Sequence, residues 1–275
     1  MPIPIFKSLK IITLIGKGRH SNVYKVLNKE NDKCFALKRI SKNIAMHREL
    51  DFYQREKRAF DVLTPHPNVV TFKAYDEEEN EAFFILEYID GFTLQRIINE
   101  SRKDEEQKKI SNSQIKKYLI QILDGIEHLH KHNVYHSDIK PENIVICGER
   151  AVIVDLGSSI ISDKKTVKYR DVSFLGTPGF LPPEVADMVS RSDVELPFVD
   201  LWAFGVTMYF AYTNHVPFVS NLAAESHNNV KKLNVDLSIL PYEVREILEY
   251  IFTKDKQKRL ELKEIRKLIM RMNCN

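Results

Sequence analysis

Residues 136–157 read HSDIKPENIVICGERAVIVDLG and combine charged residues with two short apolar segments. The segments 144–147 and 151–154 are apolar and rich in β-branched residues, and the Gly-Glu-Arg at 148–150 has the composition of a tight connection. We therefore predict a β-hairpin whose two ends lie close together. The hairpin gathers four charged or polar side chains, which are Asp138, Lys140, Asn143 and Asp155.

Burial of apolar surface does not explain this predicted cluster of polar side chains. Two carboxylates and an amide suit a divalent cation with oxygen ligands, such as Mg²⁺. A carboxylate beside an ammonium group can accept a proton from a hydroxyl and balance the charge of a transferred phosphate. The alternative interpretation is that all four are solvated loop residues between two strands.

This stretch resembles the eukaryotic protein kinase family. HSDIKPEN at 136–143 is similar to the family's catalytic loop, HRDxKxxN, and the DLG that follows the hairpin is similar to its metal-binding DFG. A lysine two places after the Asp is the serine/threonine form of this loop. The resemblance implies that Asp138 is the base that orients the substrate hydroxyl and that Lys140 steadies the transferred phosphoryl group. It also implies that Asn143 and Asp155 hold Mg²⁺.

A glycine-containing turn lies near the N-terminus. Residues 14–26, LIGKGRHSNVYKV, contain two strand-like runs joined by a turn with Gly16 and Gly18. Such a turn suits a flap whose backbone amides approach phosphates. It resembles the family's GxGxxG loop, although Ser21 stands in the position of the third glycine. The alternative is an ordinary hairpin turn.

A single lysine interrupts the apolar strand that follows. Residues 34–40 read CFALKRI, and Lys38 lies 20 residues after Gly18. A lysine in a half-buried strand is usually solvent-facing. The spacing from Gly18 is instead the one expected if Lys38 reaches phosphates under the flap.

Residues 46–63 form a predicted charged helix with an imperfect apolar stripe that ends before Pro65. Its acids include Glu49 and Glu56, and most acids on such a helix are simply solvated. REKRAF and the HPNVV that follows match the family's helix αC and the turn after it. The resemblance therefore implies that Glu56 is the partner of Lys38.

The order of predicted elements indicates two lobes. Short strands dominate up to about residue 86, and helices dominate after the last strand, 82–88. The resemblance implies an α+β, bilobal kinase fold, with a small β-rich N-terminal lobe carrying one helix and a larger, mainly helical C-terminal lobe. The expected N-terminal lobe, 1–89, holds the Gly-rich loop and the hinge, and 90–275 holds the catalytic loop and the activation segment. Together they form one kinase domain over about 10–265.

The resemblance also implies a nucleotide site at the hinge between the lobes. The backbone of Glu87 and Ile89 is expected to recognise adenine, with Leu86 as the gatekeeper behind them. The full set of implied nucleotide contacts is Ile15, Gly16, Gly18, Val23, Ala36, Lys38, Glu56, Leu86, Glu87, Ile89 and Val145. The implied cofactors are ATP and Mg²⁺.

A long helix is predicted before the catalytic loop. Ser111 and Gln114 form a possible capping box at its start. Its core stripe consists of Ile115, Tyr118, Leu119, Ile122, Leu123, Ile126 and Leu129. The charge-rich segment before it, 101–110, is expected to be an exposed loop or frayed helix end.

Residues 155–184 resemble an activation segment that closes in GTPGFLPPE. By this resemblance the hydroxyl of Thr177 is structural and lies near Asp138, with a phosphorylation site as the alternative. The same comparison implies that Asp200, in VDLWAFGV, anchors the catalytic loop. It also implies an ion pair between Glu184 and Arg259.

Ser137 occupies the place of the catalytic-loop arginine, which in the family commonly pairs with a phosphorylated activation segment. Without a guanidinium a phosphate loses a bidentate partner. We therefore hypothesise that activity does not require phosphorylation of this segment. The available hydroxyls are Ser158, Ser159, Ser162, Thr166 and Ser173.

The composition fits a globular protein large enough for two lobes and too short for a kinase with a sizeable accessory domain. The 275 residues are 43% hydrophobic and 29% charged, with a net charge of +3. Because the basic residues are interleaved with acids, nucleic-acid binding is not expected. Regulation is expected to come from a protein partner or from expression.

Three cysteines, Cys34, Cys147 and Cys274, are far apart in sequence and suggest neither a disulfide framework nor a zinc site. A cytoplasmic or nuclear location is the resulting expectation. Residues 1–16 do not resemble a signal peptide, and the longest apolar run, 201–212, is too short to cross a membrane. No membrane association is therefore expected.

Two functions from different classes remain open. The first is a serine/threonine protein kinase that transfers the γ-phosphoryl group of Mg-ATP to a protein hydroxyl. The second is a pseudokinase, a nucleotide-binding or scaffold module, suggested by Ser21, Ser137 and Leu156. These three changes remove no metal ligand and no base, which favours the enzyme. DLG, PPE and FVDLWAFGVTMY also resemble calmodulin-dependent and AMPK-activating kinases.

Overall fold

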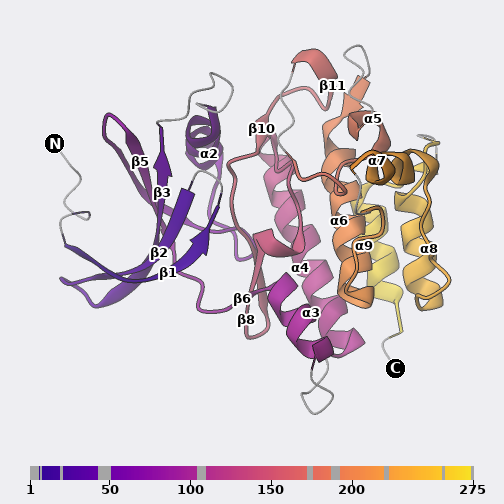
Figure 1. Ribbon diagram of the computed structural model, residues 1–275, viewed down its shortest axis with the longest axis horizontal. Coiled ribbons are helices and arrows are strands. Elements are labelled where there is room, and N and C mark those ends of the chain that lie inside the picture. The colour runs from indigo at the N-terminus through magenta and orange to yellow at the C-terminus, as the bar shows by residue number, and fades with distance from the viewer. Residues whose placement is uncertain are drawn as a thin grey trace.

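The computed structural model shows two lobes of unequal size, a strand-rich one and a helical one (Figure 1). It describes residues 6, 8–18, 21–42, 51–103, 110–171, 176–186, 193–219, 223–255 and 258–273. The predicted α+β, bilobal class is confirmed.

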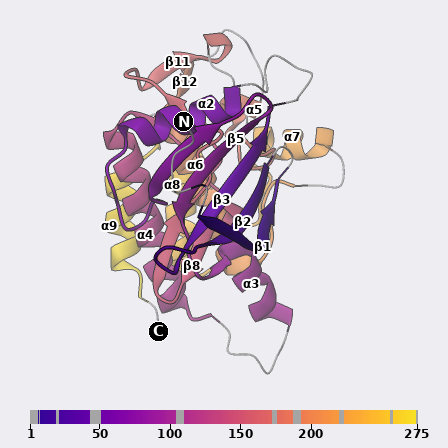
Figure 2. The same ribbon diagram turned by 90° about the vertical axis from the view of Figure 1, so that its left-hand side faces the viewer.

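The N-terminal lobe is built on a five-stranded antiparallel sheet in the order β1-β2-β3-β5-β4. Its strands are β1 (Leu9–Lys17), β2 (Ser21–Asn28), β3 (Lys33–Ser41), β4 (Phe72–Glu77) and β5 (Glu81–Glu87). Viewed from this lobe, the sheet stands in front of the helices of the larger lobe (Figure 2). The predicted glycine turn joins β1 to β2, where the Gly18 amide donates to the Ser21 carbonyl at 2.7 Å.

Helix α2 (Asp51–Val62) packs on this sheet through Ala59 and Phe60. The Phe60 ring stacks on Phe72 of β4, with ring centroids 5.2 Å apart. The predicted helix was 46–63, and its first part, with Glu49, lies outside the described residues. The helix ends three residues before Pro65, as the pattern predicted.

The C-terminal lobe holds the remaining described helices. They are α3 (Leu94–Lys103), α4 (Asn112–Lys131), α5 (Pro183–Ala186), α6 (Leu196–Thr213), α7 (Ala223–Lys232), α8 (Tyr242–Ile251) and α9 (Leu262–Arg271). The capping box of Ser111 and Gln114 is present at the start of α4, and every residue of the predicted stripe is buried. Of the charged segment 101–110, the residues 104–109 lie outside the described part of the chain.

Helix α6 is the centre of this lobe. It is mainly apolar and buried along most of its length, which explains the apolar run 201–212, interrupted by Thr207. Trp202 packs against Phe218 and Phe252, with ring centroids 5.5 and 5.0 Å away. No helix among the described residues is long and apolar enough to cross a bilayer.

The predicted hairpin is present as β8 (Ile144–Cys147) and β9 (Arg150–Ile153), with β6 (Phe92–Thr93) beside β8. Its connection is shorter than the predicted 148–150, because Arg150 pairs with Cys147 in the ladder. Gly148 takes the tight turn with a φ of 58°. The assignment of Arg150 to the turn was therefore wrong.

Two small sheets hold the segment that follows the hairpin. Strand β10 (Ile160–Ile161) pairs with β7 (Val134–Tyr135), and β11 (Thr166–Lys168) pairs with β12 (Asp193–Glu195). Lys168 and Asp193 add an ion pair of 2.7 Å across the second sheet. Backbone pairing therefore fixes the segment at two places, 160–161 and 166–168.

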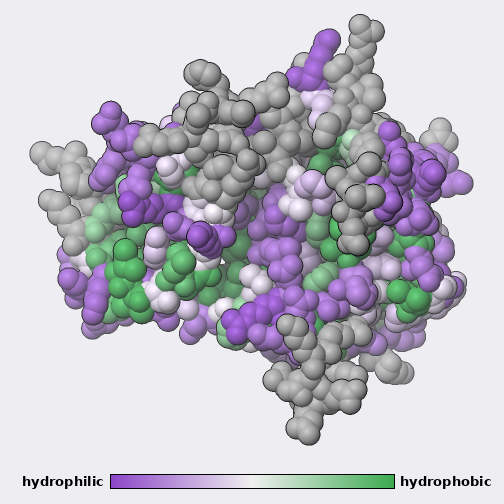
Figure 3. All heavy atoms as spheres, in the orientation of Figure 1, coloured by the Kyte–Doolittle hydropathy of each residue, from purple (hydrophilic) through white to green (hydrophobic). Residues whose placement is uncertain are grey.

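Apolar surface gathers on the N-terminal lobe where Figure 1 places β1 and β2 (Figure 3). The exposed apolar residues of β1 are Ile11, Ile12, Leu14 and Ile15. β1 is the edge strand of the sheet, and its β-branched apolar residues suit a strand without being buried in a core.

The predicted ion pair between Glu184 and Arg259 joins α5 to the segment before α9. The Arg259 guanidinium forms two hydrogen bonds to the Glu184 carboxylate, and its Nε donates to the Thr253 carbonyl at 3.1 Å. Their side chains are only 4% and 13% exposed. The pair therefore lies in a low-dielectric environment.

We expect the Arg259→Met variant to lose about 3–5 kcal/mol of unfolding free energy, because Glu184 would remain buried without a partner. Urea denaturation of the two proteins measures this loss. The double variant Glu184→Gln/Arg259→Met should recover part of it. A single variant as stable as the native chain would contradict the importance of the pair.

Candidate active site

A cavity of about 440 Å³ lies between the two lobes. It is lined by the β1–β2 turn, β3, the segment after β5, the catalytic-loop region and the start of the DLG segment. All eleven expected nucleotide contacts, from Ile15 to Val145, line this cavity, as do Lys140, Asn143 and Asp155. Asp138 lies beside it, paired with Lys140.

Lys38 of β3 is the centre of the cavity's charged end. Its Nζ lies 2.6 Å from Glu56 Oε2 and 2.7 Å from Asp155 Oδ1. The side chain of Glu56 is fully buried, whereas that of Asp155 is 48% exposed. Three segments that are far apart in sequence thus meet at one ammonium group, and α2 supplies Glu56 as expected.

These contacts keep the ammonium and the DLG carboxylate charged. Burial would lower the pKa of Lys38, but the carboxylates of Asp155 and Glu56 outweigh it and raise that pKa. Partial desolvation opposes the charge on the half-exposed Asp155, and the Lys38 ammonium overcomes it, so the pKa of Asp155 falls to about 2. For Glu56 burial prevails over Lys38 and raises the pKa to about 7.

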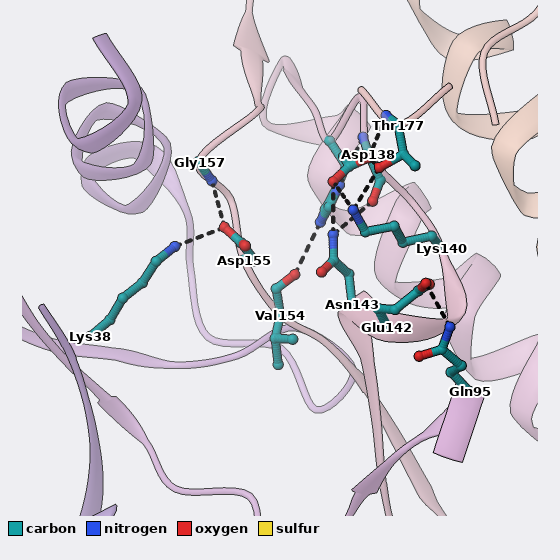
Figure 4. A network of polar contacts seen from close by, with 11 residues as sticks. Lys38, Gln95, Asp138, Lys140, Glu142, Asn143, Val154, Asp155, Gly157 and Thr177 are labelled. Carbon is teal, nitrogen blue, oxygen red and sulfur yellow. Dashed lines mark hydrogen bonds and ion pairs between the residues drawn. The ribbon is translucent and has the colours of Figure 1, made fainter. Parts of the chain in front are cut away.

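Asp138 is surrounded by donors (Figure 4). Its Oδ1 accepts hydrogen bonds from the Thr177 amide at 2.9 Å and the Thr177 hydroxyl at 2.7 Å. Its Oδ2 lies 3.2 Å from the Asn143 amide nitrogen and 2.7 Å from Lys140 Nζ. Lys140 also donates to the Thr177 hydroxyl at 2.6 Å. The carboxylate is therefore held in one orientation, beside a single ammonium.

Asp200 of α6 holds the backbone that carries Asp138. Its fully buried carboxylate accepts hydrogen bonds from the amides of His136 and Ser137 at 2.9 and 2.7 Å. His130 of α4 approaches the same carboxylate at 2.8 Å. Ser137 has a φ of 63°, a conformation that non-glycine residues seldom adopt, so these bonds stabilise an unfavourable backbone. The predicted anchor contact is present.

The residues expected to hold Mg²⁺ offer suitable oxygen atoms. The Asn143 amide nitrogen donates to Asp138, which leaves its carbonyl oxygen as the free end of the side chain. The carboxylate of Asp155 contacts Lys38 and the Gly157 amide through Oδ1 alone. Both residues line the cavity. An amide oxygen and a carboxylate oxygen on one wall fit the chemistry of Mg²⁺.

The expected hinge residues lie on the opposite side of the cavity. Leu86 is buried, and Glu87 and Ile89 are half-buried beside it. The Glu87 amide donates to the Thr71 carbonyl at 2.8 Å, so this amide already has an acceptor within the chain. The side chain of Glu87 is bound by Arg150, a contact that sequence analysis missed because it assigned Arg150 to a turn.

The activation segment corrects one sequence-based expectation. Ser159 is 1% exposed and therefore is not an available hydroxyl. Ser162 is half-buried and its hydroxyl bonds to the backbone of Lys164. Thr166 is exposed on β11, and Ser158 is half-buried. Ser173 lies outside the described residues.

Helix α2 is held in place through the loop after it. In this loop, the Thr64 carbonyl contacts His128 of α4 at 2.8 Å, and its hydroxyl contacts His132, the residue after this helix, at 3.2 Å. The His66 ring stacks on His128, and His128 packs against His132, each pair with centroids 4.5 Å apart. No group of three metal-ligating side chains was found among the described residues, so this cluster is a packing contact.

Comparison with known proteins gives a consistent result. The family model described as the protein kinase domain matches residues 9–268. The chain is 27% identical over 254 residues to the serine/threonine-protein kinase PLK4 of Drosophila grimshawi, covering 92% of this chain and 32% of that protein. It is 28% identical to protein kinase 2 of Dictyostelium discoideum, covering 92% and 51%.

A further relative is the CBL-interacting protein kinase 10 of Oryza sativa subsp. japonica, at 27% identity, with 95% of this chain and 56% of that protein covered. The chain thus spans between about a third and a little over half of the length of these relatives. Their names come from several kinase groups. The resemblance to calmodulin-dependent and AMPK-activating kinases therefore stays a prediction.

The histidine cluster predicts a loss of stability on acidification. Burial lowers the pKa of His66 and of His128, and in each case a neighbouring imidazole of the cluster lowers it further. The charged groups nearby are Asp124 and Lys131 of α4. Because the unfolded chain binds protons near pH 6.5, the stability that the neutral rings contribute is present above that pH and decreases below it.

We expect thermal melting between pH 7.5 and 5.5 to show a smaller loss of stability for His128→Gln than for the native chain. Glutamine keeps a donor for the Thr64 carbonyl but does not titrate. His215→Gln, at an exposed histidine outside the cluster, is the matched control and should behave like the native chain. Identical pH profiles for all three proteins would disprove the prediction.

Proposed function

Because this chain belongs to the protein kinase domain family, we propose that it is a serine/threonine kinase that transfers the γ-phosphoryl group of ATP to protein hydroxyls. The observation that carries the proposal is that Lys38, Asp155 and Lys140 line one cleft and that Lys140 pairs with Asp138 beside it. The relative named serine/threonine-protein kinase PLK4 supports it. Since the chain matches only part of those proteins, its substrates and partners are proposals as well.

The roles of the residues follow from their chemistry. Asp138 lies where it can accept the proton of a substrate hydroxyl, and Lys140 beside it balances charge on the transferred phosphoryl group. Lys38, held cationic by two carboxylates, would contact the other phosphates. Asn143 and Asp155 would hold Mg²⁺, which supplies positive charge at the phosphates when bound.

The second candidate is a pseudokinase that uses the same fold as a nucleotide-binding or scaffold module. Its support is Ser21, Ser137 and Leu156 in the three motifs. In the structure, the Ser137 amide donates to Asp200, and Leu156 is buried in an apolar cluster formed by both lobes. Neither Ser137 nor Leu156 lines the cavity, whereas Ser21 does. Because none of the three changes removes a metal ligand or the base, the enzyme is favoured.

We further propose a protein substrate with a Ser or Thr acceptor and a regulatory protein partner, without nucleic acid or membrane. A cytoplasmic or nuclear location is proposed from the pattern of cysteines. Of these, Cys34 and Cys147 are free thiols in the structure. Cys274 lies outside the described residues.

The decisive variant is Asp138→Asn, which keeps the shape of the side chain but removes the base. We expect phosphoryl transfer to a generic basic protein to fall about 10²- to 10⁴-fold. Stabilisation by Mg-ATP should persist at about 2.7 kcal/mol when the ligand is at 100 times its dissociation constant. Radiolabel transfer and melting temperature measure the two quantities.

Lys38→Met is the control for nucleotide-dependent activity, because it removes the cationic side chain from the phosphate end of the cavity. Both variants should be nearly inactive beside an active native chain. If the native chain is as inactive as Asp138→Asn while Mg-ATP still raises the melting temperature, the scaffold function is correct and the kinase proposal is wrong.

We also propose that activity is independent of phosphorylation of the activation segment. Ser137 offers no guanidinium to a phosphate, and its hydroxyl donates to the Tyr135 carbonyl. The segment is held instead by the β10–β7 and β11–β12 pairings and by the Glu184–Arg259 pair. These contacts hold the described parts of the segment and need no phosphate.

Phosphatase treatment of the purified enzyme should therefore leave most of its turnover intact. Mass spectrometry before and after treatment establishes the phosphorylation state, and radiolabel transfer measures the rate. A kinase known to need the modification, treated in parallel, is the control. Loss of nearly all turnover together with loss of phosphate would overturn this proposal.

A further inference from the structure

Arg150 connects three segments that are distant in sequence. It opens strand β9 of the C-terminal lobe, where it pairs with Cys147. Its Nε donates to the Pro67 carbonyl, in the loop after α2, at 2.6 Å. Its Nη1 and Nη2 donate to the two carboxylate oxygens of Glu87, at 2.7 and 3.3 Å. One guanidinium therefore binds both the end of β5 and the loop that follows α2.

Glu87 is held from a second side as well. The Thr71 hydroxyl donates to its Oε2 at 3.0 Å, and its own amide donates to the Thr71 carbonyl at 2.8 Å. Partial burial would raise the pKa of Glu87, but the hydrogen bonds from Arg150 and Thr71 outweigh it and lower that pKa. Glu87 thus remains an anion and a partner for the guanidinium.

The backbone around these residues is tied together in the same place. Val70 donates to the Ile153 carbonyl at 2.9 Å, and Ile153 donates to the Asn68 carbonyl at 2.9 Å. The Asn68 side chain donates to the Ala151 carbonyl at 2.8 Å. These bonds fix β9 relative to the loop at 67–71. Because Arg150 belongs to β9 and binds Glu87, it fixes Glu87 relative to both.

Glu87 is also part of the nucleotide cavity, together with the two residues after it, Tyr88 and Ile89. Its side chain points to Arg150, which is not among the residues that line the cavity. The side chain of Arg150 is 38% exposed and that of Glu87 is 26% exposed, so as a simple surface ion pair they would add little stability. Their bidentate geometry instead constrains orientation.

We propose that Arg150 is a positioning residue for the nucleotide: through Glu87 it holds the segment 87–89 in the conformation that receives the base. This inference rests on the proposed function. Nothing in the hydrogen bonds of Asp138, Lys140 or Asn143 involves Arg150. Its loss should therefore weaken nucleotide binding more than it slows phosphoryl transfer.

The test compares Arg150→Gln, Arg150→Lys and Glu87→Gln with the matched control Glu149→Gln. Glu149 lies on the same turn, pairs with Lys117 on the surface, and is 82% exposed. Mg-ADP binding is measured by titration calorimetry, and KM for ATP and kcat are measured with a generic basic protein. Binding of Mg-ADP does not depend on turnover.

We expect Arg150→Gln and Glu87→Gln each to weaken Mg-ADP binding about three- to tenfold, and to raise KM for ATP by more than any fall in kcat. The double variant should bind no more weakly than either single variant, because both remove the same contact. Arg150→Lys should be intermediate, since an ammonium cannot bind bidentately. Glu149→Gln should bind like the native chain.

Unchanged Mg-ADP affinity in Arg150→Gln and Glu87→Gln would overturn the inference, as would a fall in kcat and melting temperature without a change in affinity. If the native chain binds Mg-ADP but transfers no phosphate, the proposed kinase function fails, but the Mg-ADP affinities of the variants still test the role of Arg150. If the native chain binds no nucleotide, both proposals fail.

Discussion

The arrangement of the site depends on the ion pairs of the Lys38 ammonium group with Glu56 and Asp155. This ammonium group lies in a nearly fully buried position, and a buried cation is tolerated only when anions surround it. One carboxyl group, that of Glu56, comes from α2, and the other, that of Asp155, comes from the segment after β9. The need to neutralise one charge therefore joins the sheet, its helix and the C-terminal lobe.

Each of these groups is positioned by contacts outside the cavity. Helix α2 is bound to α4 through the histidines that contact Thr64, and the backbone of the catalytic loop is bound to α6 through Asp200. Both helices lie in the apolar core of the larger lobe. The packing of that core thus determines where Glu56 and Asp138 lie relative to Lys38.

At the end of the cavity that contains Glu87, a contact outside the cavity again positions a lining residue, but this contact is weaker. Arg150 and Glu87 form a partly exposed pair, whereas Lys38 and Glu56 form a buried one. A partly exposed bidentate pair orients a segment but contributes little to the free energy of unfolding. In a buried pair each member needs the other, so the chain cannot fold without forming this part of the site. Substitutions at the end of the cavity expected to hold the base should therefore cost less stability than substitutions at the end expected to hold the phosphates.

The amino-acid sequence by itself determined the class of fold, the β8–β9 hairpin and the core face of α4, and its resemblance to the kinase family identified many, but not all, of the residues that line the cavity. These follow from periodicity and from motifs, which act over a few residues. Only the tertiary structure decided that Ser159 is buried, that Arg150 begins a strand and binds Glu87, and that His66 stacks on His128, which packs against His132. The physical reason is that burial and ion pairing depend on which distant segments pack together, and local sequence patterns do not contain that information.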